Sequence, residues 1–210
     1  MIDNNVNNDK NTEELILKAA EQEFMTKGFA GARTTSIAEA AGVTHAMFHY
    51  YFRTKERLFD RIIAEKVKIL MEGLMMSVSD RDLSLEELIK SIINRHLDFI
   101  SSNPELPHFL ISEIYSNPNK IGALFANLVT NAPMFFKIIQ EKIDLSAKEG
   151  VCRRVDARML MLDIASLNIL PYIASPIVNR LLGDCMANKE EFVEMRKKEN
   201  FDTIMRKLKP

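Results

Sequence analysis

Apolar residues recur along most of this chain at intervals of three and four positions, the spacing of one face of an α-helix. In the first such segment Ile16, Ala20 and Phe24 follow one another in steps of four. Asn11 has the side chain of a helix N-cap, and Gly28 is typical of a C-terminal stop. The pattern therefore predicts a helix that starts near Asn11 and ends at Gly28.

Helical spacing continues through the rest of the chain. Two short helices, over about residues 34–41 and 45–52, precede a long one over about 54–77. Ser84 and Asn188 each stand three residues before a glutamate, a capping-box spacing that marks further helix starts. The remaining helices are expected over about residues 84–102, 120–149, 156–174 and 188–208, with a further short helix that ends near 115. Pro133 should kink or break the helix over 120–149. Strand-like alternation is scarce, so the predicted fold class is all-α.

A length of 210 residues suits one compact domain or two small ones. We expect a disordered tail over residues 1–10, an N-terminal three-helix domain over 11–57 and a C-terminal helical domain over 58–210, joined by the long helix 54–77. No apolar run approaches the roughly 18 residues that span a bilayer. The N-terminus lacks the features of a secretory signal, and the two cysteines lack CxxC spacing. A cytoplasmic location is therefore expected.

The segment 34–52 has the composition of a helix-turn-helix, in which two short helices cross at a steep angle. Ala38 and Ala41 are small enough to let the second helix cross closely. Gly42 accepts the positive φ that the turn needs, and Thr44 can cap the second helix. The apolar residues spaced to close the wedge between the helices are Ile37, Val43 and Phe48.

Charge is unevenly distributed. The net charge of the chain is −1, yet residues 24–58 carry five Lys and Arg against two Glu, a local charge of +3. A basic segment in a nearly neutral chain favours contact with nucleic acid. The first residues of the second helix of a helix-turn-helix enter the major groove, and this core does not use their side chains. The predicted DNA-binding residues are Arg33, Thr34, Thr35, Thr44, His45, Ala46, Met47, His49, Tyr50 and Lys55.

These residues divide by expected role. His45, Ala46, Met47 and Tyr50 are expected to read bases. Phosphate contacts are expected from Thr34, Thr35, His49 and Lys55.

The run IAEAAGVTHAMFHYYFRTKERLF, residues 37–59, resembles the DNA-binding region of TetR-family regulators. That family combines an I-A-x-x-A-G-V turn, an aromatic-rich recognition helix and a closing F-x-[polar]-K-[acid]-x-L. The chain departs from the pattern at His49, where the family usually has a tyrosine that touches the DNA backbone. A histidine still donates a hydrogen bond to phosphate, and does so more strongly when protonated.

The resemblance implies a C-terminal domain that binds a small molecule and dimerises through its last two helices. Here these are residues 156–174 and 188–208, and the second adds Phe192, Val193, Phe201, Ile204 and Leu208 to the expected interface. The implied function is a homodimeric repressor that leaves a near-palindromic operator when an apolar or amphipathic effector binds. Candidate effector contacts are His96, Phe99, Tyr115, Phe125, Phe136, Asn168 and Tyr172. The alternative is a structural or cell-cycle DNA-binding factor of the same fold without an effector.

Other chemistry has little support in the sequence. His45 and His49 share a helix face as in the zinc motif HExxH, but Ala46 stands where that motif has its glutamate, so no metal site is expected. Cys152 lies beside Arg153 and Arg154, which would lower its pKa, although an inert thiol is the simpler interpretation. No phosphate-binding loop or nucleophile elbow is present. We therefore expect neither a cofactor nor an enzyme.

Overall fold

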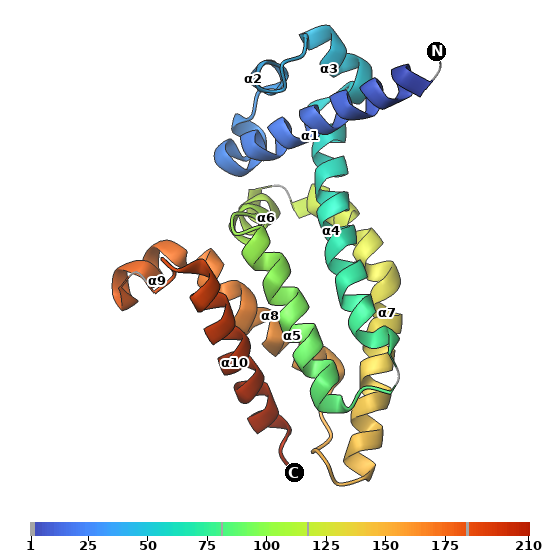
Figure 1. Cartoon of the computed structure of the whole chain (residues 1–210), viewed down its shortest axis with the longest axis vertical. Helices are drawn as coiled ribbons and strands as arrows, with labels where there is room; N and C mark the ends of the chain where they lie inside the picture. Colours follow the sequence, from blue (N-terminus) through green and yellow to red (C-terminus); the bar gives the residue numbers. More distant parts are fainter. Residues whose placement is uncertain (1–2, 81, 117, 184) are drawn as a thin grey trace. The chain divides into compact units, whose positions relative to one another are not determined.

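The computed structural model describes the backbone of residues 3–80, 82–116, 118–183 and 185–210, and their side chains except at 3–10 and 118–131. The all-α prediction is confirmed, since within these residues there are ten helices and no strand (Figure 1). The helices are α1 (Asp3–Gly31), α2 (Thr34–Ala40), α3 (His45–Phe52), α4 (Lys55–Ser79), α5 (Leu85–Ser102), α6 (Leu106–Ser116), α7 (Pro118–Lys148), α8 (Ala157–Ile173), α9 (Ser175–Leu182) and α10 (Lys189–Leu208).

Local capping explains most of these bounds. Ser84 and Glu87 form the expected capping box at the start of α5, and Asn188 accepts from the amide of Glu191 at the start of α10. Gly28 interrupts α1 with a φ of 69°, the conformation expected for a helix stop, and one further turn follows it.

Three expectations are corrected. The backbone of residues 3–10 is helical rather than a disordered tail, because α1 begins at Asp3. α7 continues through Pro133, so the chain does not break there, which was one of the two expected effects of this proline. The short helix α9 lies between the predicted helices 156–174 and 188–208 and was not predicted.

The described residues form two compact units, which are considered separately. Unit 1 comprises residues 1–67 and 109–124, and unit 2 comprises 68–108 and 125–210. The core of unit 1 is aromatic: the ring of Phe59 lies 5.5 Å from that of Phe24 and 5.0 Å from that of Phe29, both edge to face. Expected core residues Ile16 and Phe48 are fully buried.

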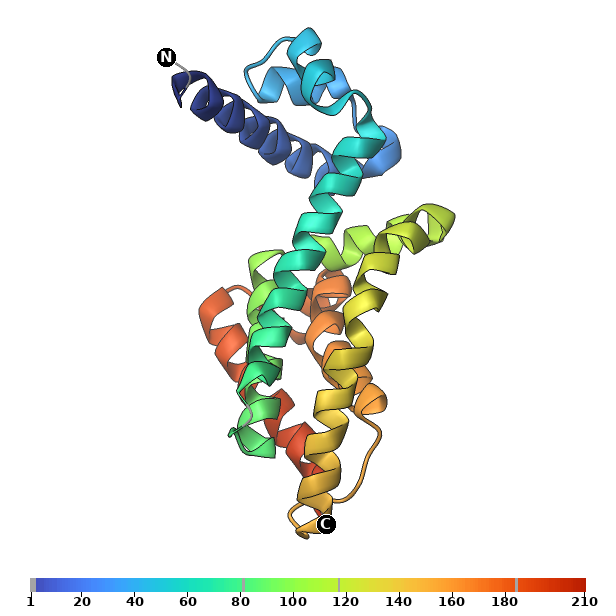
Figure 2. The same ribbon diagram turned by 90° about the vertical axis from the view of Figure 1, so that its right-hand side faces the viewer.

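Unit 2 is a helical bundle in which α5, α8 and α10 pack against one another (Figures 1 and 2). Its larger apolar core draws on α4, α5, α7, α8 and α10, and a smaller one gathers around Tyr172 and Phe192. Among the described residues no single helix has both the length and the hydropathy to cross a membrane. Only α8 and α9 together meet both criteria, with a bend of 77° between them.

Candidate nucleic-acid interface

The turn between α2 and α3 is a Schellman motif. The amide of Val43 donates to the carbonyl of Ala38 at 3.0 Å, and that of Gly42 donates to Glu39 at 3.0 Å. Gly42 has a φ of 68°, as the sequence predicted, and a Cβ there would meet no atom within 4 Å. The need for glycine is therefore conformational, and crowding plays no part.

Capping and burial fix the start and inner face of α3. The hydroxyl of Thr44 accepts from the amide of Met47 at 3.2 Å, which is the predicted N-cap bond. Phe48 is fully buried and Phe52 nearly so, while Ile37 and Ala38 of α2 are buried opposite them. These contacts fix the rotation of α3 about its own axis. The face of α3 opposite Phe48 and Phe52 must therefore point away from the core of unit 1.

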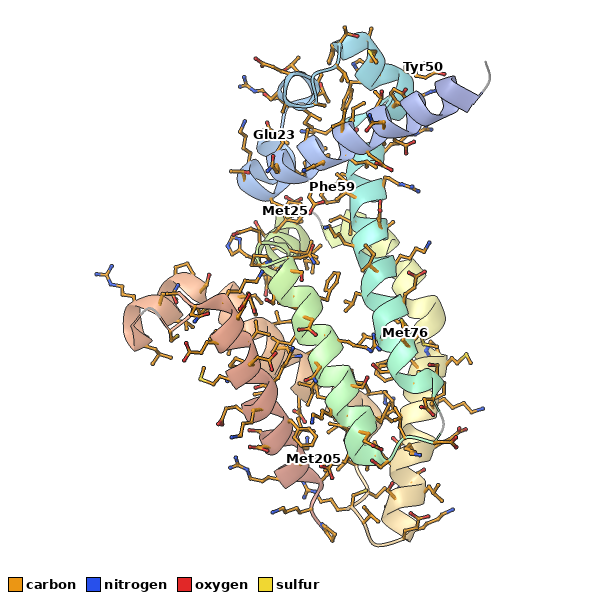
Figure 3. All side chains as sticks on the ribbon, viewed as in Figure 1. Glu23, Met25, Tyr50, Phe59, Met76 and Met205 are labelled. Atoms are coloured by element: carbon orange, nitrogen blue, oxygen red, sulfur yellow. The ribbon has the colours of Figure 1, made fainter. Side chains whose placement is uncertain are left out.

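That opposite face carries the predicted base-reading residues. His45 and Ala46 are exposed, Met47 is 39% exposed and Tyr50 is 76% exposed. Figure 3 labels Tyr50 on α3. Large apolar side chains in solvent cost free energy unless a partner covers them. The exposed Met47 and Tyr50 therefore indicate a binding face.

Two histidines lie on this face with defined partners. Nε2 of His45 is 3.1 Å from the hydroxyl of Thr34, which ties α3 to the start of α2. The rings of His45 and His49 stand edge to face with centroids 4.4 Å apart. Nδ1 of His49 donates to the carbonyl of Arg53 at 3.0 Å, since a carbonyl only accepts.

The link from α3 to α4 is a strained turn centred on Arg53. This residue has φ 53° and ψ −48°, and the amide of Thr54 donates to the carbonyl of Phe52 across it. This is a γ-turn of the rare type that L residues disfavour. The His49 ring helps to hold this turn through its bond to the Arg53 carbonyl. A second bond joins the same two residues, from the Arg53 amide to the His49 carbonyl at 3.1 Å.

Lys55, predicted to contact phosphate, has a structural role in unit 1. Its ammonium donates to the carbonyls of Phe29 at 2.8 Å and Ala32 at 2.9 Å and lies 4.6 Å from the centre of the Phe29 ring. Two of its three N–H donors thus hold the last turn of α1 against α4. A phosphate contact from Lys55 has only the remaining donor to use.

Two glutamates support the same region and were not anticipated. Buried Glu113 of α6 accepts from the amide of Phe29 at 2.9 Å, just past the break at Gly28. Glu23 accepts from the amide of Arg33 at 3.3 Å and from Lys27, and the Lys27 bond is the main reason that its pKa is lowered. The Glu23–Lys27 pair is a local i, i+4 contact, whereas the bonds to the amides of Phe29 and Arg33 join residues 84 and 10 positions apart, so no local pattern announces those two.

The predicted effector contacts lie in different surroundings. His96 and Asn168 are buried and bonded to each other, whereas Tyr172 and Phe99 belong to the smaller core cluster and Phe136 to the larger. Tyr115 is separate from them in unit 1 and is 85% exposed. The side chain of Phe125 lies outside the described residues.

Cys152 is buried, and burial raises the pKa of its thiol, so the neighbouring arginines do not activate it. Within the described part of the chain no three His, Cys, Asp or Glu residues gather in a way that could hold a metal ion.

Comparison with known proteins gives consistent matches. The model of the family described as bacterial regulatory proteins, tetR family, matches residues 16–62. The transcriptional repressor NicS of Pseudomonas putida is 31% identical over 96 residues, 43% of this chain and 45% of NicS. The nucleoid occlusion factor SlmA of Vibrio campbellii is 26% identical over 157 residues, 72% of this chain and 76% of SlmA.

Similarity in fold extends over nearly the whole chain. The TetR-family regulator PfmR of Thermus thermophilus matches with a TM-score of 0.66 at 18% identity, over 93% of this chain and 99% of PfmR. Sequence similarity is more local, because curated relatives at 31% to 33% identity are matched over less than half of their own length. The family model itself matches only residues 16–62, which contain the helix-turn-helix.

Proposed function

This chain belongs to the TetR family of bacterial regulatory proteins, and we propose that it represses transcription as a homodimer bound to a near-palindromic operator. The observation that carries the proposal is the outward face of α3. It combines exposed Met47 and Tyr50 with two histidines, on a helix whose inner face is locked into the domain by Phe48. An α-helix presented in this way fits the major groove.

The side chains divide between bases and backbone. Met47 and Tyr50 suit apolar contact with base edges and thymine methyl groups, and His45 suits an acceptor or donor there. Thr34, Thr35 and Arg33 lie at the start of α2, where they suit phosphate contact on the other side of the groove. The Thr44 hydroxyl is already used to cap α3. The DNA contact at this position would therefore come from the free backbone N–H groups at the start of α3, which Thr44 stabilises.

Selection of bound duplexes from a random pool tests this function directly. We expect a near-palindromic consensus, with affinity that falls steeply as salt rises because phosphate contacts release counterions. Tyr50→Ala should lower affinity for the consensus by about tenfold, a contact of about 1–2 kcal/mol, without changing thermal stability, because the side chain is exposed. Weak binding that is indifferent to sequence would overturn the proposal.

An effector site is proposed in unit 2. A cavity of about 180 Å³ lies where the ends of α5 and α8 meet the start of α10, and Ser101, Glu105, Tyr172, Ser175, Lys189 and Phe192 are among its lining residues. The Tyr172 hydroxyl is buried and has no hydrogen bond of normal geometry to the described residues. Ser101 is a polar neighbour of the hydroxyl, and a buried hydroxyl whose hydrogen bonding is incomplete favours a ligand that completes it. This volume lies below the roughly 300–1,000 Å³ of pockets for drug-sized ligands, so the cavity suits a smaller molecule.

Tyr172→Phe removes only that hydroxyl. We expect the variant to fold as stably as the wild type, since the lost group had no full partner. Short-chain alcohols and carboxylates that raise the Tm of the wild type should stabilise the variant less, with binding about tenfold weaker. Equal stabilisation of both proteins would contradict the placement of the site, and unaltered DNA affinity with such a ligand would contradict its regulatory role.

Dimerisation is proposed through the exposed apolar faces of α8 and α9, with Met195 of α10. Met159, Leu162 and Leu170 stand in solvent along one side of α8, and Ile177, Leu181 and Leu182 do so on α9. The expected contribution of the last helix is revised here, because Phe192, Val193, Ile204 and Leu208 are buried within the protomer and Phe201 packs against the same core.

The similarity to SlmA supports one alternative, a DNA-bound factor of this fold that needs no effector. Operator affinity that no small molecule changes would favour it, provided that binding in the DNA selection is sequence-specific.

A further inference from the structure

We propose that His49 contacts a DNA phosphate only in its protonated form, so that this chain takes up protons when it binds DNA. The inference rests on the proposed function and names a condition under which that function operates. The inference follows from the hydrogen bond that Nδ1 of the His49 ring already makes.

The bond to Arg53 fixes the tautomer of the ring. Nδ1 of His49 lies 3.0 Å from a backbone carbonyl oxygen, which has no proton to donate, so Nδ1 carries the hydrogen. In a neutral imidazole the other nitrogen, Nε2, then has a lone pair and no hydrogen. A phosphate oxygen is also an acceptor, and two acceptors repel each other. Protonation places a hydrogen on Nε2 and a positive charge on the ring, which converts repulsion into a charge-assisted hydrogen bond.

The ring has little freedom to release Nδ1 instead. Arg53 is held at φ 53° in the γ-turn, and its amide donates to the His49 carbonyl at 3.1 Å. The side-chain bond and this backbone bond together close a ring of contacts between the two residues. A change to the other neutral tautomer would place the Nδ1 lone pair against the Arg53 carbonyl and remove support from a strained turn.

The neighbours of the His49 ring come from α3, α2 and the turn into α4. The ring is hydrogen-bonded to the Arg53 carbonyl and lies against the rings of His45 and Phe48, with centroids 4.4 Å and 5.5 Å away. The one charged residue of α2, which packs against α3, is Glu39, and the turn into α4 adds Arg53 and Lys55. The Lys55 ammonium is bonded to the carbonyls of α1.

His45 is the competing site for the proton. Its Nε2 is bonded to the Thr34 hydroxyl, and a hydroxyl can either donate or accept, so this bond survives in both protonation states. The two rings have centroids 4.4 Å apart, so two positive charges on them would repel each other. The phosphate places that proton on His49, whose Nε2 would otherwise have no hydrogen to donate.

The test measures DNA affinity as a function of pH with the full chain. The duplex recovered by selection is titrated by fluorescence anisotropy between about pH 5.5 and 8 at constant ionic strength, a range that brackets the ordinary imidazole value of about 6.5. We expect wild-type affinity to weaken about tenfold across this range. His49→Gln keeps an amide donor for the Arg53 carbonyl but does not titrate, so its affinity should be weaker and independent of pH.

Two further variants separate the explanations. His49→Arg carries its charge at every pH, so its affinity should also be flat, and circular dichroism shows whether either variant has lost its fold. His45→Gln should retain the wild-type slope. A flat wild-type profile, or a slope that persists in His49→Gln or disappears in His45→Gln, would overturn the proposal. Absence of sequence-specific binding at every pH would instead remove the proposed function itself.

Discussion

The chain is expected to lose about 3 kcal/mol of its free energy of unfolding between pH 7 and pH 4 through one residue of unit 2, His96. His96 is 6% exposed, and burial lowers its pKa from 6.5 to about 4. An unfolded imidazole takes up its proton near pH 6.5, whereas the folded one does not until about pH 4. Stability is therefore complete above pH 6.5, falls as the pH drops through this window and levels off below it.

A hydrogen-bond chain explains why protonation is costly. The amide of Asn168 donates to the carbonyl of Ile93 at 3.2 Å and lies 3.0 Å from Nδ1 of His96, so Nδ1 accepts and the neutral ring carries its proton on Nε2. Asn200 in turn donates to Asn168 at 2.7 Å, which links α5, α8 and α10 through buried polar groups. A proton on Nδ1 would oppose the Asn168 donor and leave a charge in a dry site.

Denaturant unfolding at several pH values, with wild type and His96→Gln, measures this contribution. The carboxylates of the chain also titrate below pH 5, so the informative quantity is the difference between the two proteins. We expect His96→Gln to be less stable than the wild type at pH 7. Below pH 6.5 it should not show the additional fall in unfolding free energy that His96 causes in the wild type. His108→Gln is the matched control, because His108 is exposed and its removal should leave the profile unchanged. Parallel profiles for wild type and His96→Gln would contradict the assignment.

The contrast between Gly42 and Lys55 shows what the sequence could reveal. The turn at Gly42 and the cap at Thr44 join residues a few positions apart, so residue type and spacing were enough to predict both. Lys55 was predicted to face DNA, but its partners Phe29 and Ala32 lie more than twenty positions away. Only tertiary packing brings them together.

The effector contacts and the last helix show a second limit. Periodicity indicates that a residue is buried, but it does not say which buried residues face one another. His96 and Asn168 were selected separately and turned out to be bonded, while Tyr115 is exposed in the other unit. Likewise the apolar residues of α10 are buried in the core of their own protomer. The apolar side chains that remain exposed near them come largely from α8 and α9.

Leu162→Glu together with Leu170→Glu is expected to convert the proposed dimer into a monomer. The two side chains are 57% and 63% exposed and lie eight residues apart on the same side of α8. An isologous interface contains every residue twice, so the double variant would bury four carboxylates. Each unpaired buried charge costs several kcal/mol, which corresponds to a dissociation constant raised on the order of 100-fold or more.

Sedimentation velocity over a dilution series, followed by DNA binding, separates this effect from unfolding. Leu145→Glu on α7 is the matched control, since Leu145 is 52% exposed in the same unit but lies outside the proposed interface. The control should remain dimeric. The double variant should keep its helical content and its weak, sequence-indifferent DNA binding, because α3 is intact. It should lose preference for the full operator, since one α3 reads only half of a palindrome. A double variant that stays dimeric would show that this face of α8 is not the interface.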